Sequence, residues 1–303
     1  MGVDVAAHSP PARALFEIAQ SIVGYDLLAL QKNGPDEKLR ETQYSQPAIF
    51  VTNLALYTAA AADGFDSHVV VSAGHSFGEF CSLVAAGSLS FEDALAIVDE
   101  RGKAMQHAAE LAPGGMSAVL GLDAQKIRDV VDRTREATGK RVQLANFNSP
   151  TQIVISGDID AVISAGEAMM AEGAKRVVPL NVSGAWHSAL MQPAIERFAK
   201  AVDSAKFAMP KFDVISNVDA QPYRDVETIK KNLVASISNE VRWHETAERI
   251  LQYNVDLVAE FGASGVLGPL MKRMPNSPDV KVVSDAPGVA KLVRHTQDDT
   301  VKA

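Results

Sequence analysis

The pentapeptide GHSFG at residues 74–78 constrains the fold of this chain more than any other segment. It follows HVVVSAG, a β-branched run typical of a buried strand, and precedes EFCSLVAAG, which has the pattern of a helix. A G-x-S-x-G motif between a strand and a helix predicts a nucleophile elbow, a sharp turn that exposes the serine oxygen. We therefore expect Ser76 to be a nucleophile and the backbone N–H of Phe77 to be an oxyanion donor, with a chance match as the alternative.

A serine nucleophile needs a base, and the sequence offers several histidines. His187 lies in VSGAWHS, a loop between two predicted elements, where functional residues concentrate. His75 is adjacent to the serine, but neighbouring residues at an elbow point in different directions, so we interpret it as a packing residue. From the residues alone, His244 and His107 remain alternatives to His187, and a purely structural role is a further alternative for each. The full set of candidates is His8, His68, His75, His107, His187, His244 and His295.

Charge and composition limit the classes of protein that this sequence can represent. The 303 residues include 29 Lys and Arg against 37 Asp and Glu, a formal charge of −8. A net acidic chain without basic runs argues against nucleic acid or an anionic membrane as the main partner. Cys81 is the only cysteine, which excludes a disulfide framework and is typical of the reducing cytoplasm. The most apolar stretch, residues 48–62, is too short to cross a bilayer, so we expect a soluble cytoplasmic protein.

A second pattern, over residues 113–180, predicts a small inserted subdomain. The strand-like segments MSAVLGL, RVQLANF, QIVISG and KRVVPL alternate with the helical segments DAQKIRDVVDRTREATG and DIDAVISAGEAMMAEG. The order β-α-β-β-α-β is that of a ferredoxin-like unit. We predict an α/β fold in which this subdomain interrupts a hydrolase-like parallel-sheet body formed by residues 1–112 and 181–303.

The segments outside the insert fit such a body. Helical patterns dominate before it, and the last of them covers residues 91–111 with Ser90 as a cap. A helix near residues 189–203, the short strand DVISN and a strand at residues 256–262 come after it. The body therefore mixes long helices with short, apolar strands, as a parallel sheet covered by helices requires.

Five segments carry a resemblance to a known family. They are GHSFGEF (74–80), RGKAMQ (101–106), ANFNSPTQIVISG (145–157), SGAWHSALM (183–191) and VRW (241–243). In order and spacing the chain resembles, over almost its whole length, the malonyl-CoA:acyl carrier protein transacylases of fatty-acid and polyketide synthesis. The resemblance implies transfer of a malonyl group from malonyl-CoA to the phosphopantetheine thiol of an acyl carrier protein, through a malonyl-serine. It implies no metal and no cofactor, since the partner protein carries the phosphopantetheine.

The resemblance also implies a role for three residues. Ser76 matches the nucleophile, His187 the base, and Arg101 the arginine that binds the free carboxylate of the malonyl group. A guanidinium suits that role, because it forms a two-pronged, charge-assisted bond with a carboxylate and stays ionised when enclosed. Without the resemblance, Arg101 is better interpreted as a surface residue paired with Glu100 or Asp99.

At three further positions the family has a typical residue, and this chain has Trp186, Ser236 and Phe77 there. Trp186 stands directly before the histidine, where an aromatic residue accompanies malonyl selectivity in related enzymes; it would narrow the pocket, and core packing is the alternative interpretation. Ser236, in SISNEVRW, replaces a glutamine that relatives usually have near the histidine. A main-chain carbonyl of this region orients the histidine in the family, so any residue can supply it. Phe77 replaces a more usual leucine, which we expect to change only the shape of the pocket.

The N-terminus is the largest departure from the pattern. Family members normally begin with a strand that ends in a Gly-Gln-Gly-x-Gln loop, which supplies a second oxyanion N–H. Here MGVDVAAHSPPARALFEIA aligns with the family segment that comes after that loop. Either the start is mis-assigned or trimmed, or the protein lacks that donor, whose loss typically costs about 10²–10³ in rate.

Two other functions compete with malonyl transfer. One is thioester hydrolysis by an α/β-hydrolase or by a relative that strips acyl groups from carrier proteins; Arg101 argues against it, because acyl-stripping relatives tend to lack this arginine. The insert and the absence of an obvious acidic partner for His187 argue against a general esterase. The other is a non-catalytic module that binds carrier proteins, against which the intact Ser76, Arg101 and His187 argue.

A carrier protein as partner requires a local basic patch, because carrier proteins are typically acidic and this chain is acidic overall. Lys272 and Arg273, in GPLMKRM, and Arg242 are the candidates for such a patch. Ordinary solvated surface charge is the alternative interpretation of all three.

Overall fold

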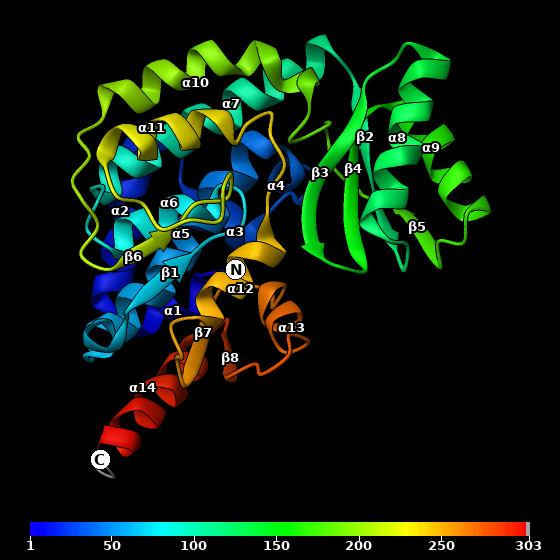
Figure 1. Ribbon diagram of the computed structural model, residues 1–303. Coiled ribbons are helices and arrows are strands. Elements are labelled where there is room, and N and C mark those ends of the chain that lie inside the picture. Colours follow the sequence, from blue (N-terminus) through cyan, green and yellow to red (C-terminus); the bar gives the residue numbers. More distant parts are fainter. Residues whose placement is uncertain (301–303) are drawn as a thin grey trace.

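The computed structural model describes residues 1–300, with side chains described up to residue 297. A largely helical α/β body lies beside a four-stranded sheet with two helices (Figure 1). None of the described helices is long and apolar enough to cross a membrane. The first part of the body contains α1 (Val3–His8), α2 (Pro10–Val23), α3 (Leu27–Asn33), α4 (Asp36–Arg40), α5 (Thr42–Ala61), β1 (Val71–Ala73), α6 (Gly78–Ala85) and α7 (Phe91–Leu111).

Two long helices, α5 and α7, pack against each other in the body. Ser90 caps α7 as predicted, since its Oγ accepts a hydrogen bond of 3.0 Å from the backbone N–H of Asp93. Both helices bury apolar side chains, Phe50 from α5 and Leu95 from α7 among them, in one core. Because α7 is enclosed over most of its length, side chains in its middle face the protein interior.

The inserted subdomain has the predicted β-α-β-β-α-β order. Its sheet has the strand order β3-β4-β2-β5 with every neighbouring pair antiparallel, and α8 and α9 cover one face. Val119, Ile127 and Ile153 belong to a hydrophobic core of its own under these helices. The elements are β2 (Gly114–Leu120), α8 (Ala124–Thr138), β3 (Val142–Ser149), β4 (Gln152–Asp158), α9 (Ile159–Ala171) and β5 (Arg176–Pro179).

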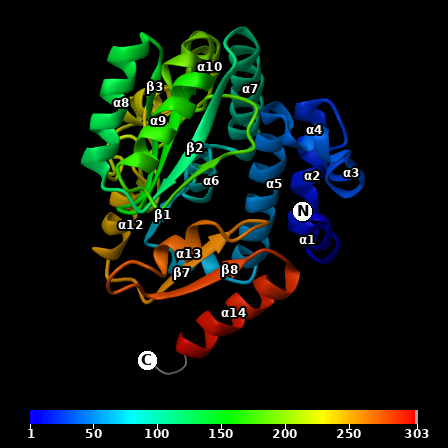
Figure 2. The ribbon, with the colours of Figure 1, turned by 90° about the vertical axis from the view of Figure 1, so that its right-hand side faces the viewer.

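The second part of the body completes the parallel strands. β1 pairs with β6 and β7 with β8, both in parallel, which confirms the predicted parallel body; its strands form two two-stranded sheets. Figure 2 shows β7 and β8 between α14 and the rest of the body. The sequence pattern did not predict β8. The elements are α10 (Gln192–Ser204), β6 (Asp213–Ile215), α11 (Val226–Ala235), α12 (Trp243–Leu251), β7 (Leu257–Phe261), α13 (Leu267–Met271), β8 (Asp279–Val283) and α14 (Ala286–Thr300).

The edge of β3 connects the subdomain to the body. The backbone N–H of Phe147 donates to Val241 O, and the N–H of Val241 donates to Ala145 O, both at 2.8 Å. Val241 lies in the segment between α11 and α12, so this segment continues the sheet of the subdomain. The two parts are therefore joined by backbone hydrogen bonds as well as by the chain itself.

Candidate active site

The GHSFG segment forms a sharp turn between β1 and α6. Ser76 has a φ of 54°, in the left-handed region that costs a non-glycine residue about 1–3 kcal/mol. A side chain at Gly74 would place its Cβ 2.0 Å from the backbone carbonyl of Gly78, so only glycine fits there. The predicted elbow geometry is therefore present, with the serine at the carboxyl end of β1.

A buried network holds this turn in place. Asn217, just beyond β6, accepts a hydrogen bond from Ser76 N at 3.1 Å and donates through Nδ2 to the carbonyls of Gly74 and Ser76, at 2.9 and 3.2 Å. Glu79 accepts from the backbone N–H and the Nδ2 of Asn217 and from the hydroxyl of Tyr223. Burial raises the pKa of Glu79 to about 7, because a charged carboxylate loses its hydration there.

Ser76 and His187 meet at hydrogen-bond distance. Ser76 Oγ lies 2.8 Å from His187 Nε2, and His187 Nδ1 lies 2.7 Å from the carbonyl oxygen of Ser236. A carbonyl only accepts, so Nδ1 carries the proton and Nε2 is left to accept from the serine hydroxyl. Burial, and then the positive charge of Arg101, lower the pKa of His187 to about 3. The imidazole is therefore neutral at physiological pH, as a base must be.

Arg101 is buried beside the serine. It is 1% exposed; its Nη1 donates to Gln46 Oε1 at 2.7 Å and its Nη2 to Ser76 Oγ at 3.1 Å. Burial lowers its pKa to about 10, so it stays charged. Within residues 1–297 it forms no ion pair with a carboxylate, and its Nε has no acceptor. The enclosed cation therefore has one unused donor, Nε, next to the Nη2 group that reaches Ser76.

The alternative interpretation of Arg101 as a surface residue is wrong. Glu100 pairs instead with Arg197, and Asp99 lies 2.6 Å from Lys103 Nζ. The two acidic neighbours thus point to other sides of the helix and leave Arg101 facing the site. A buried, unpaired charge is costly unless an anion binds it, and the substrate-binding role of Arg101 stays a prediction that this burial supports.

The backbone N–H of Phe77 is available to a ligand. No acceptor for it is found among the described residues, whereas the N–H of Ser76 is already bonded to Asn217. Phe77 precedes the first turn of α6, where backbone N–H groups point away from the helix and favour negative charge. Its ring lies 6.0 Å from the guanidinium carbon of Arg101, so the side chain also borders the site.

The other histidines lie elsewhere or pack. His75 Nε2 is 2.9 Å from Asn148 Oδ1, and its ring lies 5.8 Å from that of Trp243, which fits the predicted packing role. His244 pairs with Glu248 and is not among the contacts of Ser76. The exposed His107 lies 3.9 Å from Glu110, so neither alternative to His187 reaches the serine.

Trp186 is half-buried between two cores. It packs against the main core of the body and against a small cluster under the sheet of the subdomain. A Cβ at Gly184 would lie 2.6 Å from its ring, which shows how closely the loop folds around the indole. These contacts fit the core-packing interpretation, and a role in substrate selection stays a prediction.

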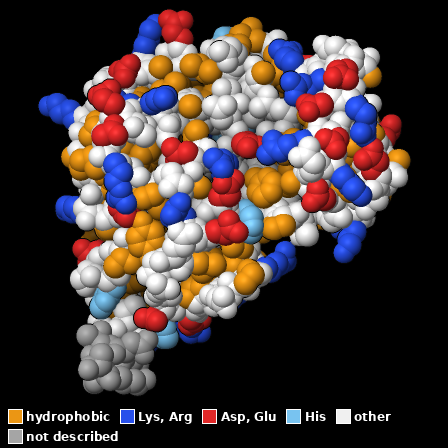
Figure 3. Space-filling view, viewed as in Figure 1, with side chains coloured by type: hydrophobic (Ala, Val, Ile, Leu, Met, Phe, Trp, Pro, Cys, Tyr) orange, Lys and Arg blue, Asp and Glu red, His pale blue; other side chains and the backbone are white. Residues whose placement is uncertain are grey.

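The three candidate docking residues differ in their surroundings. Arg242 forms an ion pair with Glu245, so its charge is compensated. Lys272 and Arg273 directly follow α13, are exposed, and have no acidic partner among the described side chains. Figure 3 shows basic and acidic side chains interspersed over one face of the molecule, without a large area of one sign.

Sequence reasoning missed the residues that support the site. Gln46 and Asn217 are distant in sequence from the residues that they hold, and single polar residues give no periodic signal. One signal existed for Asn217: it follows the short strand DVISN, and parallel neighbours expose their carboxyl ends at the same edge of a sheet. The described residues contain no group of three His, Cys, Asp or Glu side chains that could hold a metal ion.

The elbow and the Ser–His pair define a serine-dependent enzyme of acyl-transfer chemistry, the class shared by acyltransferases and serine hydrolases. The sequence model of the acyl transferase domain family matches residues 1–300. The malonyl CoA-acyl carrier protein transacylase of Salmonella typhimurium is 39% identical, over 90% of this chain and 88% of the relative. That of Bacillus subtilis is 35% identical, over 100% and 95%.

Solved structures agree with these relatives. A malonyl-transacylase in complex with its acyl carrier protein of a type II polyketide synthase superposes with a TM-score of 0.92 at 37% identity, covering 97% of this chain and 94% of that one. The transacylase of Coxiella burnetii gives 0.92 at 34% identity, covering 97% and 92%. The chain therefore belongs to the acyl transferase family and, within it, to the malonyl-CoA:acyl carrier protein transacylases, which confirms the resemblance found in the sequence.

Proposed function

We propose that this protein transfers a malonyl group from malonyl-CoA to the phosphopantetheine thiol of an acyl carrier protein. The relatives of known activity support this function over nearly the whole chain. The observation that carries it is the buried, unpaired guanidinium of Arg101, 3.1 Å from the oxygen of Ser76. A hydrolase of neutral esters would have no use for a charge enclosed at that distance from its nucleophile.

The first half-reaction loads the serine. Ser76 Oγ attacks the thioester carbon of malonyl-CoA while His187 Nε2 takes the hydroxyl proton. The N–H of Phe77 donates to the oxyanion that forms. The carbon–sulfur bond then breaks, the proton passes from His187 to the sulfur, and CoA leaves as a thiol. A malonyl ester of Ser76 remains.

The second half-reaction repeats these steps with a different thiol. The phosphopantetheine sulfur of the carrier protein attacks the ester carbon and gives its proton to His187. The bond to Ser76 Oγ breaks, and His187 returns the proton to the serine. Throughout, the Nε–Nη2 edge of Arg101 binds the malonyl carboxylate in a two-pronged contact, while Gln46 holds Nη1.

Mass spectrometry of the intact protein tests the function directly. Incubation with malonyl-CoA should add one malonyl group to the wild type and none to Ser76→Ala. Acetyl-CoA should load far more slowly, and Arg101→Ala should reverse this preference. Arg197→Ala is the matched control, because it removes an exposed guanidinium that pairs with the neighbouring Glu100. Equal loading of acetyl and malonyl groups by the wild type would contradict the role of Arg101.

We further propose that the carrier protein docks near Lys272 and Arg273, which are exposed and without acidic partners among the described residues. Reversal of both charges should raise the KM for the carrier protein several-fold and leave loading from malonyl-CoA unchanged. Reversal of Arg242, whose charge Glu245 already compensates, should have the smaller effect. Equal effects on both half-reactions would show that the two residues act on folding or on CoA instead.

The remaining predictions concern organisation, substrate selection and location. We propose that residues 113–180 form the smaller domain and residues 1–112 and 181–303 the body, supported by the separate core of the subdomain.

We propose that Trp186 limits the size of the acyl group; Trp186→Ala should then admit a methylmalonyl group. A cytoplasmic location is proposed from the single cysteine, Cys81.

A further inference from the structure

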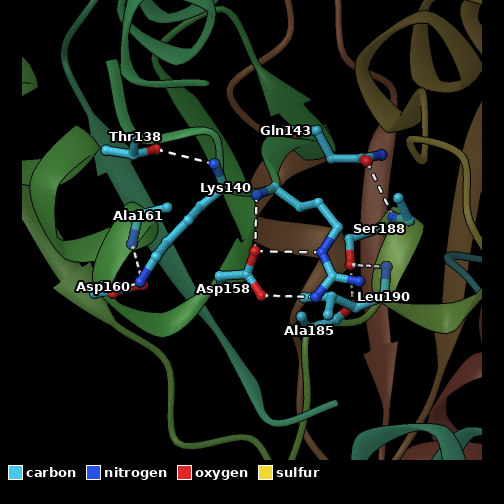
Figure 4. Close-up of polar contacts among 11 residues, drawn as sticks. Thr138, Lys140, Gln143, Asp158, Asp160, Ala161, Ala185, Ser188 and Leu190 are labelled. Carbon is cyan, nitrogen blue, oxygen red and sulfur yellow. Dashed lines mark hydrogen bonds and ion pairs between the residues drawn. The ribbon is translucent and has the colours of Figure 1, made fainter. Parts of the chain in front are cut away.

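Gln143 on β3 contacts the loop that carries the base. Successive side chains of a strand point to opposite faces, and its neighbours Val142 and Leu144 lie in the core beneath α8 and α9. Gln143 therefore points the other way, toward the body. Figure 4 shows its side chain directed at the loop that contains Ser188 and Leu190, just after His187.

Three hydrogen bonds use the amide of Gln143. Its Nε2 donates to the carbonyl of His187 at 3.2 Å and to that of Ser238 at 3.1 Å, and its Oε1 accepts from the N–H of Ala189 at 3.1 Å. Two acceptors on one side and a donor on the other fix the orientation of the amide. No other donor to the carbonyl of His187 or Ser238 is found in the described part of the chain.

These contacts lie at a strained point of the backbone. His187 has a φ of 57°, a conformation that a residue with a side chain adopts only when its surroundings enforce it. Gln143 holds this residue through its carbonyl and through Ala189, two residues further on. It also holds Ser238, two residues beyond the carbonyl of Ser236 that receives the proton of His187 Nδ1.

We propose that Gln143 is a positioning residue that holds His187 and its carbonyl acceptor in register for the reaction, and so connects the inserted subdomain to the Ser–His pair. The hydrogen bonds of Gln143 go to His187, Ala189 and Ser238 and not to Ser76 or Arg101. The proposal rests on the proposed function only in that His187 activates Ser76; it does not depend on which acyl group is transferred.

Two substitutions test the proposal. Gln143→Ala removes all three bonds, and the kcat for malonyl loading should fall about tenfold. Gln143→Glu keeps the size of the side chain but replaces the Nε2 group, which donates to the carbonyls of His187 and Ser238, with an oxygen that can only accept. The kcat should then fall about a hundredfold. The KM for malonyl-CoA should stay within about twofold in both, since Arg101 and the elbow are unchanged. Gln152→Glu, at a half-buried position of β4 in the same sheet, should behave like the wild type.

A second measurement separates this proposal from the function itself. Phenylmethylsulfonyl fluoride reports the reactivity of Ser76 without needing malonyl recognition, and its labelling rate should fall in parallel with kcat. In Gln143→Glu the added carboxylate favours the protonated imidazole, so the acid limb of labelling should move to higher pH than in Gln143→Ala. If the wild type reacts with phenylmethylsulfonyl fluoride but does not load from malonyl-CoA, the proposed function is wrong. The role of Gln143 can still be tested with phenylmethylsulfonyl fluoride in that case.

Two results would contradict the positioning role of Gln143. All rates are divided by the folded fraction, measured by circular dichroism at the assay temperature. If both variants then label Ser76 and load malonyl at the wild-type rate, Gln143 is only a structural contact and the proposal is wrong. A changed KM with an unchanged kcat would also overturn it, because it would place the effect on binding rather than on His187.

Discussion

The two residues of the candidate dyad are held in the same backbone conformation by different means. Ser76 and His187 have φ values of 54° and 57°, both in the left-handed region. Around Ser76 the support is a buried network of Asn217, Glu79 and Tyr223, all within the body. Around His187 it is a backbone carbonyl and one half-buried amide, supplied by separate parts of the chain.

The difference follows from how each turn is built. β1 and β6 are parallel with Ala73 opposite Ile215, so Ser76 and Asn217 emerge side by side at one edge of the sheet. The elbow is thus supported by its neighbouring strand. No strand in the described part of the chain lies beside the loop of His187 in this way, and the loop is fixed where the subdomain meets the body. Substitutions that disturb the elbow should therefore lower both activity and the free energy of unfolding. Substitutions that disturb the histidine loop should lower activity and leave the free energy of unfolding nearly unchanged.

Asn217→Ala should have the largest effect of the substitutions that test this difference between the two turns. It removes the amide that bonds Gly74 and Ser76 and the Nδ2 group that donates to Glu79, while the backbone N–H of residue 217 still reaches that carboxyl. We expect a loss of about 3 kcal/mol in the free energy of unfolding and more than about a hundredfold in the rate of loading. Urea unfolding and intact-mass kinetics measure both. Asn33→Ala, at an exposed position of α3, is the control; a stable but inactive Asn217→Ala would contradict the coupling to the fold.

The titration of Glu79 should make the free energy of unfolding depend on pH. Its pKa is raised to about 7, so the folded state binds the proton more tightly than the unfolded state. Stability from this group is complete below pH 4.5 and falls as pH rises through 7, by about 3 kcal/mol in all. Glu79→Gln, which cannot ionise, should lose this decline, while the exposed Glu17→Gln should keep it. Parallel pH curves for Glu79→Gln and the wild type, from urea unfolding at several pH values, would contradict the raised pKa.

The sequence predicted the elements that local pattern determines. GHSFG between an apolar run and a helix was enough for the elbow, and alternating strands and helices were enough for the subdomain. Arg101 needed the family resemblance, because its neighbours Glu100 and Asp99 make it look like part of a solvated helix face. Nothing local marked the contacts of Gln143, which form only when β3 meets two distant loops.

The parallel sheets were predicted less completely than the subdomain, for a physical reason. The subdomain shows its four strands as separate apolar runs in a regular alternation with two helices, and its strands β3 and β4 are joined by a short connection. The short strand β6 was predicted, as DVISN, but β8 was not; β8 has five residues and pairs with β7 across α13. A short strand whose partner is distant has too few residues to show a period.

His187 provides the smallest and most specific test, because its pH response has the opposite sign to that of Glu79. Its pKa is lowered to about 3, first by burial and then by the charge of Arg101. The folded state thus resists protonation: stability from this group is present above pH 6.5 and is lost as pH falls toward 3. For the same reason, labelling of Ser76 by phenylmethylsulfonyl fluoride should stay constant from pH 8 to below about 5 in the wild type.

Arg101→Gln removes the positive charge while it keeps a polar group next to Gln46. The pKa of His187 should then rise, and the acid limb of labelling should move up by about one pH unit. The reagent carries no carboxylate, so this shift reports the field on the imidazole and not the loss of malonyl binding. Arg197→Gln, at the surface, should leave the limb in place. A limb that moves in neither variant would mean that burial alone sets the pKa of His187 and that Arg101 acts on the substrate only. An equal shift in both variants would mean that the effect is not specific to Arg101.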